Sequence, residues 1–427
     1  MTYFHLSKKY TVKIKMSNIN SEKLDFFDGK VYSTYIMKEK ILKLNDIKNK
    51  NLQTVLEIML QTDGLSRTEI ARRTGCDNTT VSRAVRELMN RGILIHGEKS
   101  GQEHGRPQQK LKFNPDGPAL IGISLEAERI NGVITDLRGT VRDREQIIFN
   151  KTPDKDQFLF AVEKIIRILR TKAKDNSVGM GVAVFGSYSG PDYKLEKTAA
   201  LPILNGIELR PFLNSAADFQ VSICDHLVSK MAFLTRMFPE FNTGSVMLVS
   251  SGSGIGSLIA EQGRFLFVKN NHSGEFGHST SVPDGVLCGC GRRGCLETVA
   301  SVRALLQNCR EKLQKPDLKF DELCQMFQDD DPVITQEVNS VADYLGIAIS
   351  SQLNSWPLDQ LILTGRMFEL GSKFQSMLEE RINSLVFSSV LSGLSIHFIR
   401  LDHDNSLARG AAIFAGRSTG VLEKLLY

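Results

Sequence analysis

The chain has 427 residues, of which 41% are hydrophobic and 24% are charged, a composition typical of a globular protein with two or three domains. No apolar run approaches the roughly 20 residues that are needed to span a bilayer. The N-terminal residues also lack the small-residue cleavage pattern of a signal peptide. We therefore expect no membrane insertion and a cytoplasmic location.

The positive charge lies in the first quarter of the chain. Residues 1–115 contain 21 of the 53 basic and 12 of the 48 acidic residues, so the remainder is mildly acidic. This asymmetry indicates a polyanionic partner for the basic quarter, and a solvated basic tail is the alternative. Residues 1–37 show weak periodicity and many lysines, and we expect a poorly ordered basic tail there. From Lys38 to Gly64, apolar residues recur at helical spacing.

A helix-turn-helix pattern follows. Ser66 and Glu69 predict a capping box at the start of a short helix, and Gly75 predicts its end. The next helix buries an apolar stripe between Val81 and Met89 and leaves polar and basic residues outside, which suits a DNA major groove. A small helical packing domain is the alternative. From these two helices, the residues expected to contact DNA are Ser66, Arg67, Asn78, Thr79, Thr80, Arg83 and Arg86.

A wing completes this module. Residues 93–96 and 111–113 have the pattern of strands, and a polar, glycine-rich segment separates them. That segment contains Gly105, Arg106 and Pro107, and an extended arginine suits a narrow A·T-rich minor groove. A plain linker is the alternative for this tripeptide. We expect residues 38–115 to form a winged helix-turn-helix domain that binds double-stranded operator DNA.

The rest of the chain predicts a duplicated α/β fold. A strand-turn-strand pattern at residues 119–136 recurs at residues 244–259, and paired lobes of this kind flank a ligand cleft. We expect lobe 1 to comprise residues 117–232 with 401–427, and lobe 2 to comprise residues 233–400. Asp225 ends a predicted strand, where a carboxylate can accept a ligand hydroxyl or cap the following helix equally well.

Four residues form the most specific motif. His278, Cys288, Cys290 and Cys295 supply the one imidazole and three thiolates of a closed structural zinc site. Glycines between the cysteines allow the tight wrapping that this spacing needs. Free buried thiols are the alternative. Without an export signal, clustered cysteines favour metal over disulfides.

The motif His…Cys-Gly-Cys-Gly-x-x-Gly-Cys resembles that of the ROK family of sugar kinases and repressors, and the N-terminal module is similar to that of the repressor branch. The resemblance implies an α/β fold with a winged helix-turn-helix and a two-lobed actin/hexokinase-like (ribonuclease-H-like) domain. It also implies a sugar or sugar phosphate in the cleft. Cys224 departs from the asparagine of the family pattern. The implied sugar-binding residues are Asp225, Glu275, His278 and Glu297.

The phosphate loops argue against an enzyme. The family's first loop, Asp-x-Gly-Gly-Thr, corresponds here to residues 124–128, where Ser124 replaces the aspartate and Glu126 and Glu128 add negative charge. Loss of the glycines and the added carboxylates both oppose ATP phosphates. The second loop, Gly252–Gly256, is largely kept, but without the first loop we interpret it as a tight hairpin turn. We therefore predict no catalytic residue.

These features predict a DNA-binding transcriptional regulator, a repressor of carbohydrate genes, that is controlled by a sugar or sugar phosphate. Palindromic operators favour a homodimer, with a tetramer as the alternative. Sugar binding would change the lobe geometry and hence the spacing of the two DNA-contacting helices. The alternatives are an active sugar kinase and a regulator controlled by a protein partner such as a sugar transporter.

Overall fold

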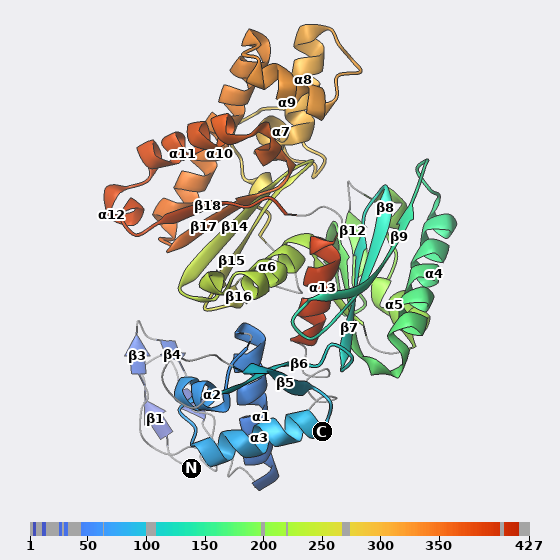
Figure 1. Cartoon of the computed structure of the whole chain (residues 1–427). Helices are drawn as coiled ribbons and strands as arrows, with labels where there is room; N and C mark the ends of the chain where they lie inside the picture. The colour runs from blue at the N-terminus through green and yellow to red at the C-terminus, as the bar shows by residue number, and fades with distance from the viewer. Residues whose placement is uncertain are drawn as a thin grey trace. The chain divides into compact units, whose positions relative to one another are not determined.

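The structure is a computed structural model (Figure 1) in two compact units, residues 1–48 and 49–427. It describes residues 3–5, 11–13, 25–27, 30–32, 44–62, 64–99, 108–197, 201–218, 221–266, 274–401 and 405–417. In the first unit, β1 (Tyr3–His5) pairs with β2 (Thr11–Lys13), and β3 (Asp25–Phe27) pairs with β4 (Lys30–Tyr32). The described part of the expected tail thus forms two antiparallel pairs, because three-residue strands are too short to leave a periodic pattern.

The helices and strands expected between residues 38 and 115 are present. They are α1 (Leu44–Gln61), α2 (Arg67–Thr74), α3 (Asn78–Asn90), β5 (Leu94–Lys99) and β6 (Gln109–Phe113). Gly75 ends α2 with a φ of 69°, a left-handed conformation that glycine adopts without strain. Strands β5 and β6 are antiparallel, with Leu94 opposite Phe113. The buried side chains of Leu56, Ile70 and Val85 belong to the core of this module.

The first large sheet has the strand order β13-β10-β7-β8-β9. Strands β7, β8 and β9 form an antiparallel meander, and β10 and β13 extend it in parallel. Helix α4 (Lys155–Ala173) packs against β8 and β9, and α5 (Leu209–Ala217) packs against α4. The strands are β7 (Ala119–Leu125), β8 (Arg129–Thr135), β9 (Val141–Ile148), β10 (Ser177–Val184) and β13 (Ser222–Asp225). A separate pair is β11 (Ser187–Ser189) with β12 (Lys194–Lys197).

The second large sheet repeats this arrangement in the order β16-β15-β14-β17-β18. Again three antiparallel strands are followed by two parallel ones, which confirms the expected duplicated α/β fold. The strands are β14 (Ser245–Ser251), β15 (Ile255–Glu261), β16 (Arg264–Leu266), β17 (Gln360–Thr364) and β18 (Ser395–Phe398). The helices of this lobe are α7 (Glu297–Ala300), α8 (Val302–Leu313), α9 (Phe320–Gln328), α10 (Pro332–Ser355), α11 (Ser372–Leu385) and α12 (Ser388–Leu391).

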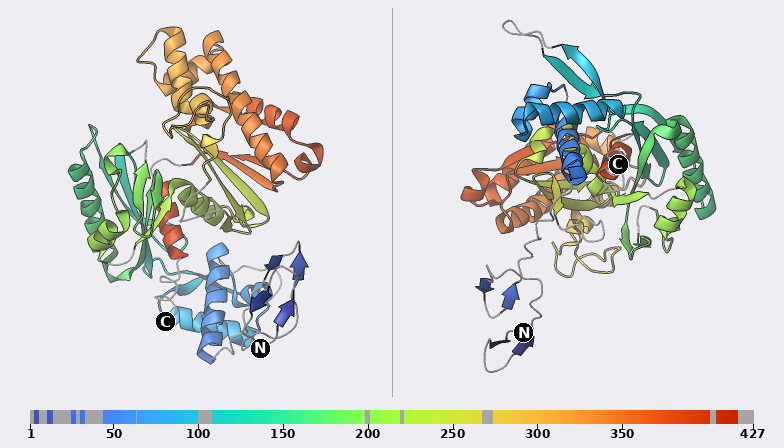
Figure 2. Two further views of the ribbon diagram at one scale, coloured as in Figure 1. Left: turned by 180° about the vertical axis from the view of Figure 1, so that it is seen from behind. Right: turned by 90° about the horizontal axis from the view of Figure 1, so that it is seen from below.

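Two helices lie between the large sheets, α6 (His226–Met237) and α13 (Ser406–Gly416) (Figures 1 and 2). Helix α13 packs against β7 and β10, so the last of the described helices belongs to the first lobe. The contact needs glycine: a Cβ on Gly122 would lie 1.9 Å from the carbonyl oxygen of Ala408. The expected lobe boundary after residue 232 falls inside α6, because one continuous helix serves both lobes. No helix in the described part of the chain has the length and apolar character that a bilayer span requires.

Candidate functional site

Helix α3 carries five of the ten residues expected to contact DNA, and four of these lie on its exposed side. Asp77 caps the helix, its Oδ1 accepting hydrogen bonds from the backbone N–H groups of Thr79 and Thr80 at 2.9 and 2.8 Å. The Thr80 side chain is half-buried, and its hydroxyl donates to Asp77 Oδ2 at 2.6 Å. The helix buries its apolar stripe in the module core and leaves the opposite side in solvent. Among the residues of α3 that we expect to contact DNA, the exposed ones are Asn78, Thr79, Arg83 and Arg86.

Ser66 requires a correction. Its side chain is only 2% exposed and caps α2, where Oγ accepts from the Glu69 backbone N–H at 3.3 Å and donates to Gln108 Oε1 at 2.6 Å. These internal bonds make it a structural cap rather than a DNA contact. Arg67 is half-buried, with Nη2 3.8 Å from the sulfur of Met89. The expected minor-groove residues, Gly105, Arg106 and Pro107, lie outside the described residues.

The wing is attached to α2 by an ion pair that the sequence did not reveal. Lys110 Nζ lies 2.7 Å from Glu69 Oε2. Hydrogen bonds from Lys110 and from the Ser66 backbone lower the pKa of Glu69 to about 2, so the carboxylate is charged at neutral pH. The two residues are 41 positions apart, too far for a local pattern to pair them. The contact fixes the base of β6 against the helix-turn-helix.

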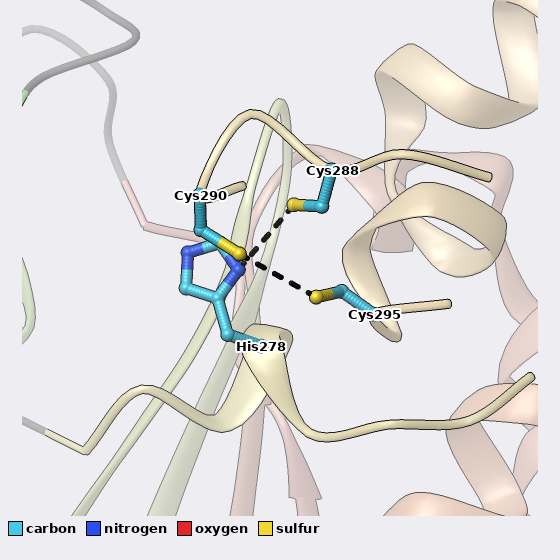
Figure 3. A group of neighbouring side chains, drawn as sticks. All are labelled: His278, Cys288, Cys290 and Cys295. Carbon is cyan, nitrogen blue, oxygen red and sulfur yellow. Dashed lines mark hydrogen bonds between the residues drawn. The ribbon is translucent and has the colours of Figure 1, made fainter. Parts of the chain in front are cut away.

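The expected metal ligands meet at one point of the second lobe (Figure 3). The donor atoms of His278, Cys288, Cys290 and Cys295 all lie within 4.8 Å of one another. Nδ1 of His278 is 3.6 Å from Sγ of Cys288, and the sulfurs of Cys290 and Cys295 are also 3.6 Å apart. A tetrahedral zinc site with bonds near 2.3 Å places its sulfurs about 3.7 Å apart. The donor set fits zinc, and the two 3.6 Å separations are close to this spacing.

Hydrogen bonds and a closely packed glycine shape the backbone around the cysteines. The N–H of Cys288 donates to the Arg292 carbonyl at 2.7 Å, and Gly291 donates back to Cys288 at 2.9 Å. Gly294 has a φ of 67°, and a Cβ there would lie 1.6 Å from the Val282 carbonyl oxygen. Only glycine fits that position. A hydrogen bond from the Arg292 backbone N–H lowers the pKa of the Cys290 thiol to about 6, whereas burial raises the pKa of Cys295 to about 12. Of these two thiols, Cys290 more readily forms the thiolate that a metal needs.

Two expected sugar ligands lie beside this cluster. Nε2 of His278, the nitrogen that faces away from Cys288, is 3.9 Å from Oε2 of Glu275, whose side chain is 64% exposed. Glu297 is more enclosed: Oε1 accepts from Arg303 at 2.8 Å, and Oε2 accepts from the backbone N–H of Ile255 at 3.3 Å. Glu297 thus contacts both α8 and the first residue of β15.

Asp225 comes from the first lobe, at the carboxyl end of β13. The residue is buried, and Oδ1 accepts from the backbone N–H groups of Leu227 and Val228, both at 2.8 Å. Asp225 therefore caps α6, which was one of the two expected roles. The neighbouring thiol of Cys224 is fully buried, and burial raises its pKa. Cys224 packs in the apolar cluster between the lobes.

The first phosphate-loop position is filled by side chains. Glu126 Oε1 accepts from Ser124 Oγ at 3.1 Å and from Asn131 Nδ2 at 3.0 Å. In α6, Lys230 donates to Ser250 Oγ at 2.6 Å. Burial lowers the pKa of Lys230 to about 8, and the negative charge of Glu126 partly opposes that shift. Two charged side chains, Glu126 and Lys230, thus have neutral polar partners from β7, β8 and β14 in this part of the molecule.

A model of the ROK family matches residues 120–418, and a winged helix-turn-helix DNA-binding model matches residues 48–95. The chain belongs to the ROK family. Among curated relatives, the xylose repressor of Bacillus subtilis (strain 168) is 26% identical over 350 residues, which cover 81% of this chain and 89% of the relative. The N-acetylglucosamine repressor of Escherichia coli O157:H7 is 21% identical over 397 residues, covering 88% and 95%.

Solved structures confirm the fold of a ROK protein with an N-terminal DNA-binding module. A ROK family transcriptional regulator described as a homolog of the E. coli MLC protein has a TM-score of 0.73 at 20% identity, covering 89% of this chain and 99% of that one. A ROK family glucokinase from Streptomyces griseus, in complex with glucose and AMPPNP, has a TM-score of 0.57 at 17% identity and covers 70% and 100%. The regulator thus matches 89% of this chain and the glucokinase matches 70% of it.

Proposed function

We propose that this ROK protein is a transcriptional repressor of carbohydrate genes whose hold on operator DNA is controlled by a sugar or sugar phosphate. The observation that carries the proposal is the exposed basic side of α3, with Arg83 and Arg86, on a module joined to a sugar-kinase fold. Arginines on such a helix contact phosphates and base edges in a major groove. Relatives that match along both modules are named as repressors.

The proposed effector site uses Asp225, Glu275, His278 and Glu297. Three carboxylates and an imidazole offer acceptors and one exchangeable donor, which suits the hydroxyl groups of a sugar. Glu275 and His278 are already 3.9 Å apart. Asp225 at the start of α6 and Glu297 at the start of α7 belong to opposite lobes, so a sugar that contacts both would favour one arrangement of the lobes.

Zinc is proposed as a structural element of this site. It would be held by His278, Cys288, Cys290 and Cys295, and when bound it supplies four bonds that fix the loop. His278 would use Nδ1 for the metal and Nε2 for the sugar side. We further propose a homodimer, because two copies of α3 are needed to read a palindromic operator.

The proposal is tested with full-length protein and a DNA duplex selected by that protein from a random pool. Replacing Arg83 and Arg86 by alanine should weaken binding at least tenfold, since each lost arginine contact is worth about 1–3 kcal/mol. Arg167→Ala, on α4 of the first lobe, is the matched control and should bind normally. Unchanged affinity in the Arg83/Arg86 variant would refute the DNA-binding surface.

Effector control is tested by titrating the DNA complex with a panel that includes D-xylose, N-acetylglucosamine and their phosphates. Release by one of them is expected, and Glu275→Gln should raise the concentration required by roughly tenfold, because one charge-assisted hydrogen bond is lost. If no member of the panel releases DNA, control by a small sugar is contradicted and control by a protein partner replaces it.

A further inference from the structure

Helix α6 begins at one proposed functional site. Its cap is Asp225, and the capping bonds to Leu227 and Val228 fix the carboxylate relative to the first turn of the helix. A ligand that moves or reorients this carboxylate therefore acts directly on the helix. The short capping bonds leave little freedom between the two.

The body of α6 is held as a unit between the lobes. All residues from Met231 to Thr235 are buried, so the helix has no solvent-exposed side in that stretch. Ser229 Oγ donates to the Leu407 carbonyl at 2.6 Å, and a Cβ on Gly410 would lie 2.0 Å from the Ser229 carbonyl oxygen. This close packing means that a shift at one end of the helix is carried to the other, because packed interiors do not deform continuously.

The far end of α6 contacts the DNA-binding module. Nη1 of Arg236 lies 3.4 Å from the carbonyl oxygen of Leu60, in the last turn of α1, and 3.4 Å from that of Leu137, in the turn between β8 and β9. Carbonyls in the last turn of a helix lack partners within the helix and attract a cation. Arg236 thus joins the first lobe and α1 of the DNA-binding module.

A second contact lies at the same end. Met237, the last residue of α6, lines a hollow of about 260 Å³ together with Lys112 and Phe113 of β6 and Arg138 of the turn between β8 and β9. The end of α6 therefore meets both the first helix and the wing of the DNA-binding module. The hollow leaves space into which these elements can shift.

Burial removes the guanidinium of Arg236 from water. Burial and the nearby charges of Arg417 and Arg138 lower its pKa to about 9, and the charge of Asp136 opposes that shift. Its two hydrogen bonds reach carbonyls of different modules, so the arginine connects the modules at a cost in desolvation.

We propose that α6 transmits effector occupancy from Asp225 to the DNA-binding module, and that Arg236 is the positioning residue that makes the connection. The inference rests on the proposed function and deepens it by naming the route of regulation. It predicts that the response to effector depends on Arg236, although this residue touches neither the proposed sugar site nor the exposed side of α3.

The test compares DNA affinity with and without the releasing sugar in wild-type protein and in Arg236→Met. Allosteric couplings correspond to about 5–150-fold changes in affinity. The wild-type ratio should fall in that range, and Arg236→Met should reduce it below about threefold. Arg310→Met is the matched control, because Arg310 donates two hydrogen bonds to the Leu318 carbonyl, at 2.9 and 2.7 Å, within the second lobe. An unchanged ratio in Arg236→Met would overturn the proposal.

A second experiment, which needs no sugar, tests the role of α6 independently of the proposed function. Asp225→Ala removes the cap of α6 and should change DNA affinity in the wild-type background but not in Arg236→Met, so the two substitutions are non-additive. Additive effects would overturn the role of Arg236 even if no sugar releases DNA. If Asp225→Ala does not fold, Asp225→Ser keeps a shorter capping oxygen and takes its place.

Discussion

His226 shows how tertiary burial changes the chemistry of a single residue. Its ring stacks on Phe185 with centroids 4.3 Å apart, and Nδ1 is buried without a hydrogen-bond partner among the described residues. Burial, with a smaller contribution from the charge of Lys230, lowers its pKa to about 3. The imidazole is therefore neutral in the folded protein throughout the range in which an unfolded histidine gains a proton.

This shift predicts a loss of stability in acid. The unfolded chain binds a proton below pH 6.5 while the folded chain does not, so the free energy of unfolding falls as the pH falls from 6.5 toward 3. Between pH 7 and 5 His226 should contribute a loss of roughly 1–2 kcal/mol. His226→Phe keeps the stack on Phe185 and should remove that part of the pH dependence in urea unfolding curves. If the free energy of unfolding depended on pH in the same way in both proteins, the pKa shift of His226 would be contradicted.

Ser66 makes the complementary point for a residue that sequence reasoning placed on the wrong surface. The pattern Ser66…Glu69 predicted the capping box, which the structure contains. The hydroxyl of Ser66 is used by the cap, and the side chain is only 2% exposed. It is therefore not available to contact DNA. Arg83 and Arg86, which have no such role, remain exposed.

At the level of elements, the cysteine loop is the clearest case of local determination. Cys288, Cys290 and Cys295 lie within eight positions, and the tight backbone at Gly294, which packs against the Val282 carbonyl, helps to bring them together. Only His278 arrives from outside the loop, from the short 3-10 helix Phe276–His278. A chelated ion would join these two segments where no disulfide is present.

Loss of a cysteine ligand tests whether this loop binds zinc. The purified protein should contain one zinc per chain by elemental analysis, and Cys290→Ser should lose most of it and lower the Tm by several degrees, since a cross-link between two segments is lost. Cys324→Ser, half-buried in α9 and remote in sequence from the loop, is the matched control and should retain the metal. Full zinc content in Cys290→Ser would exclude this site.

At the scale of the whole molecule, we expect ATP binding to depend on one loop from each lobe. The kept loop Gly252–Gly256 belongs to the second lobe, while the altered loop at residues 124–128 belongs to the first. In the first lobe Glu126 accepts hydrogen bonds from Ser124 and Asn131, and its Oε2 lies 3.6 Å from Nε of Arg129. The resemblance to the family's kinases would place a glycine at this position. A nucleotide would have to displace this network and accept a nearby negative charge.

We therefore expect no ATP-dependent phosphorylation of any sugar by the natural protein, and a Kd for Mg-ATP above about 1 mM by calorimetry. The quadruple change Ser124→Asp, Glu126→Gly, Ala127→Gly and Glu128→Thr restores the family's loop and should strengthen ATP binding measurably. The single change Glu128→Thr is the control and should leave ATP binding unchanged. Sugar phosphorylation by the natural protein would show that the kinase function is retained.

The sequence by itself determined the features that depend on neighbouring residues. The capping box of α2, the glycine that ends it, the spacing of the cysteines and the repeated strand-turn-strand pattern are all local, and backbone geometry follows directly from them. Family resemblance added the two-lobed architecture. These suffice for the class of protein and for most of the candidate site.

Only the tertiary structure decided which distant groups meet. Lys110 and Glu69, 41 positions apart, and Arg236 and Leu60, 176 positions apart, are brought together by the packing of whole elements. The continuity of α6 across the expected lobe boundary is likewise a consequence of burial from both sides. Such contacts leave no period in the sequence, because the free energy that selects them comes from the assembled core rather than from any one segment.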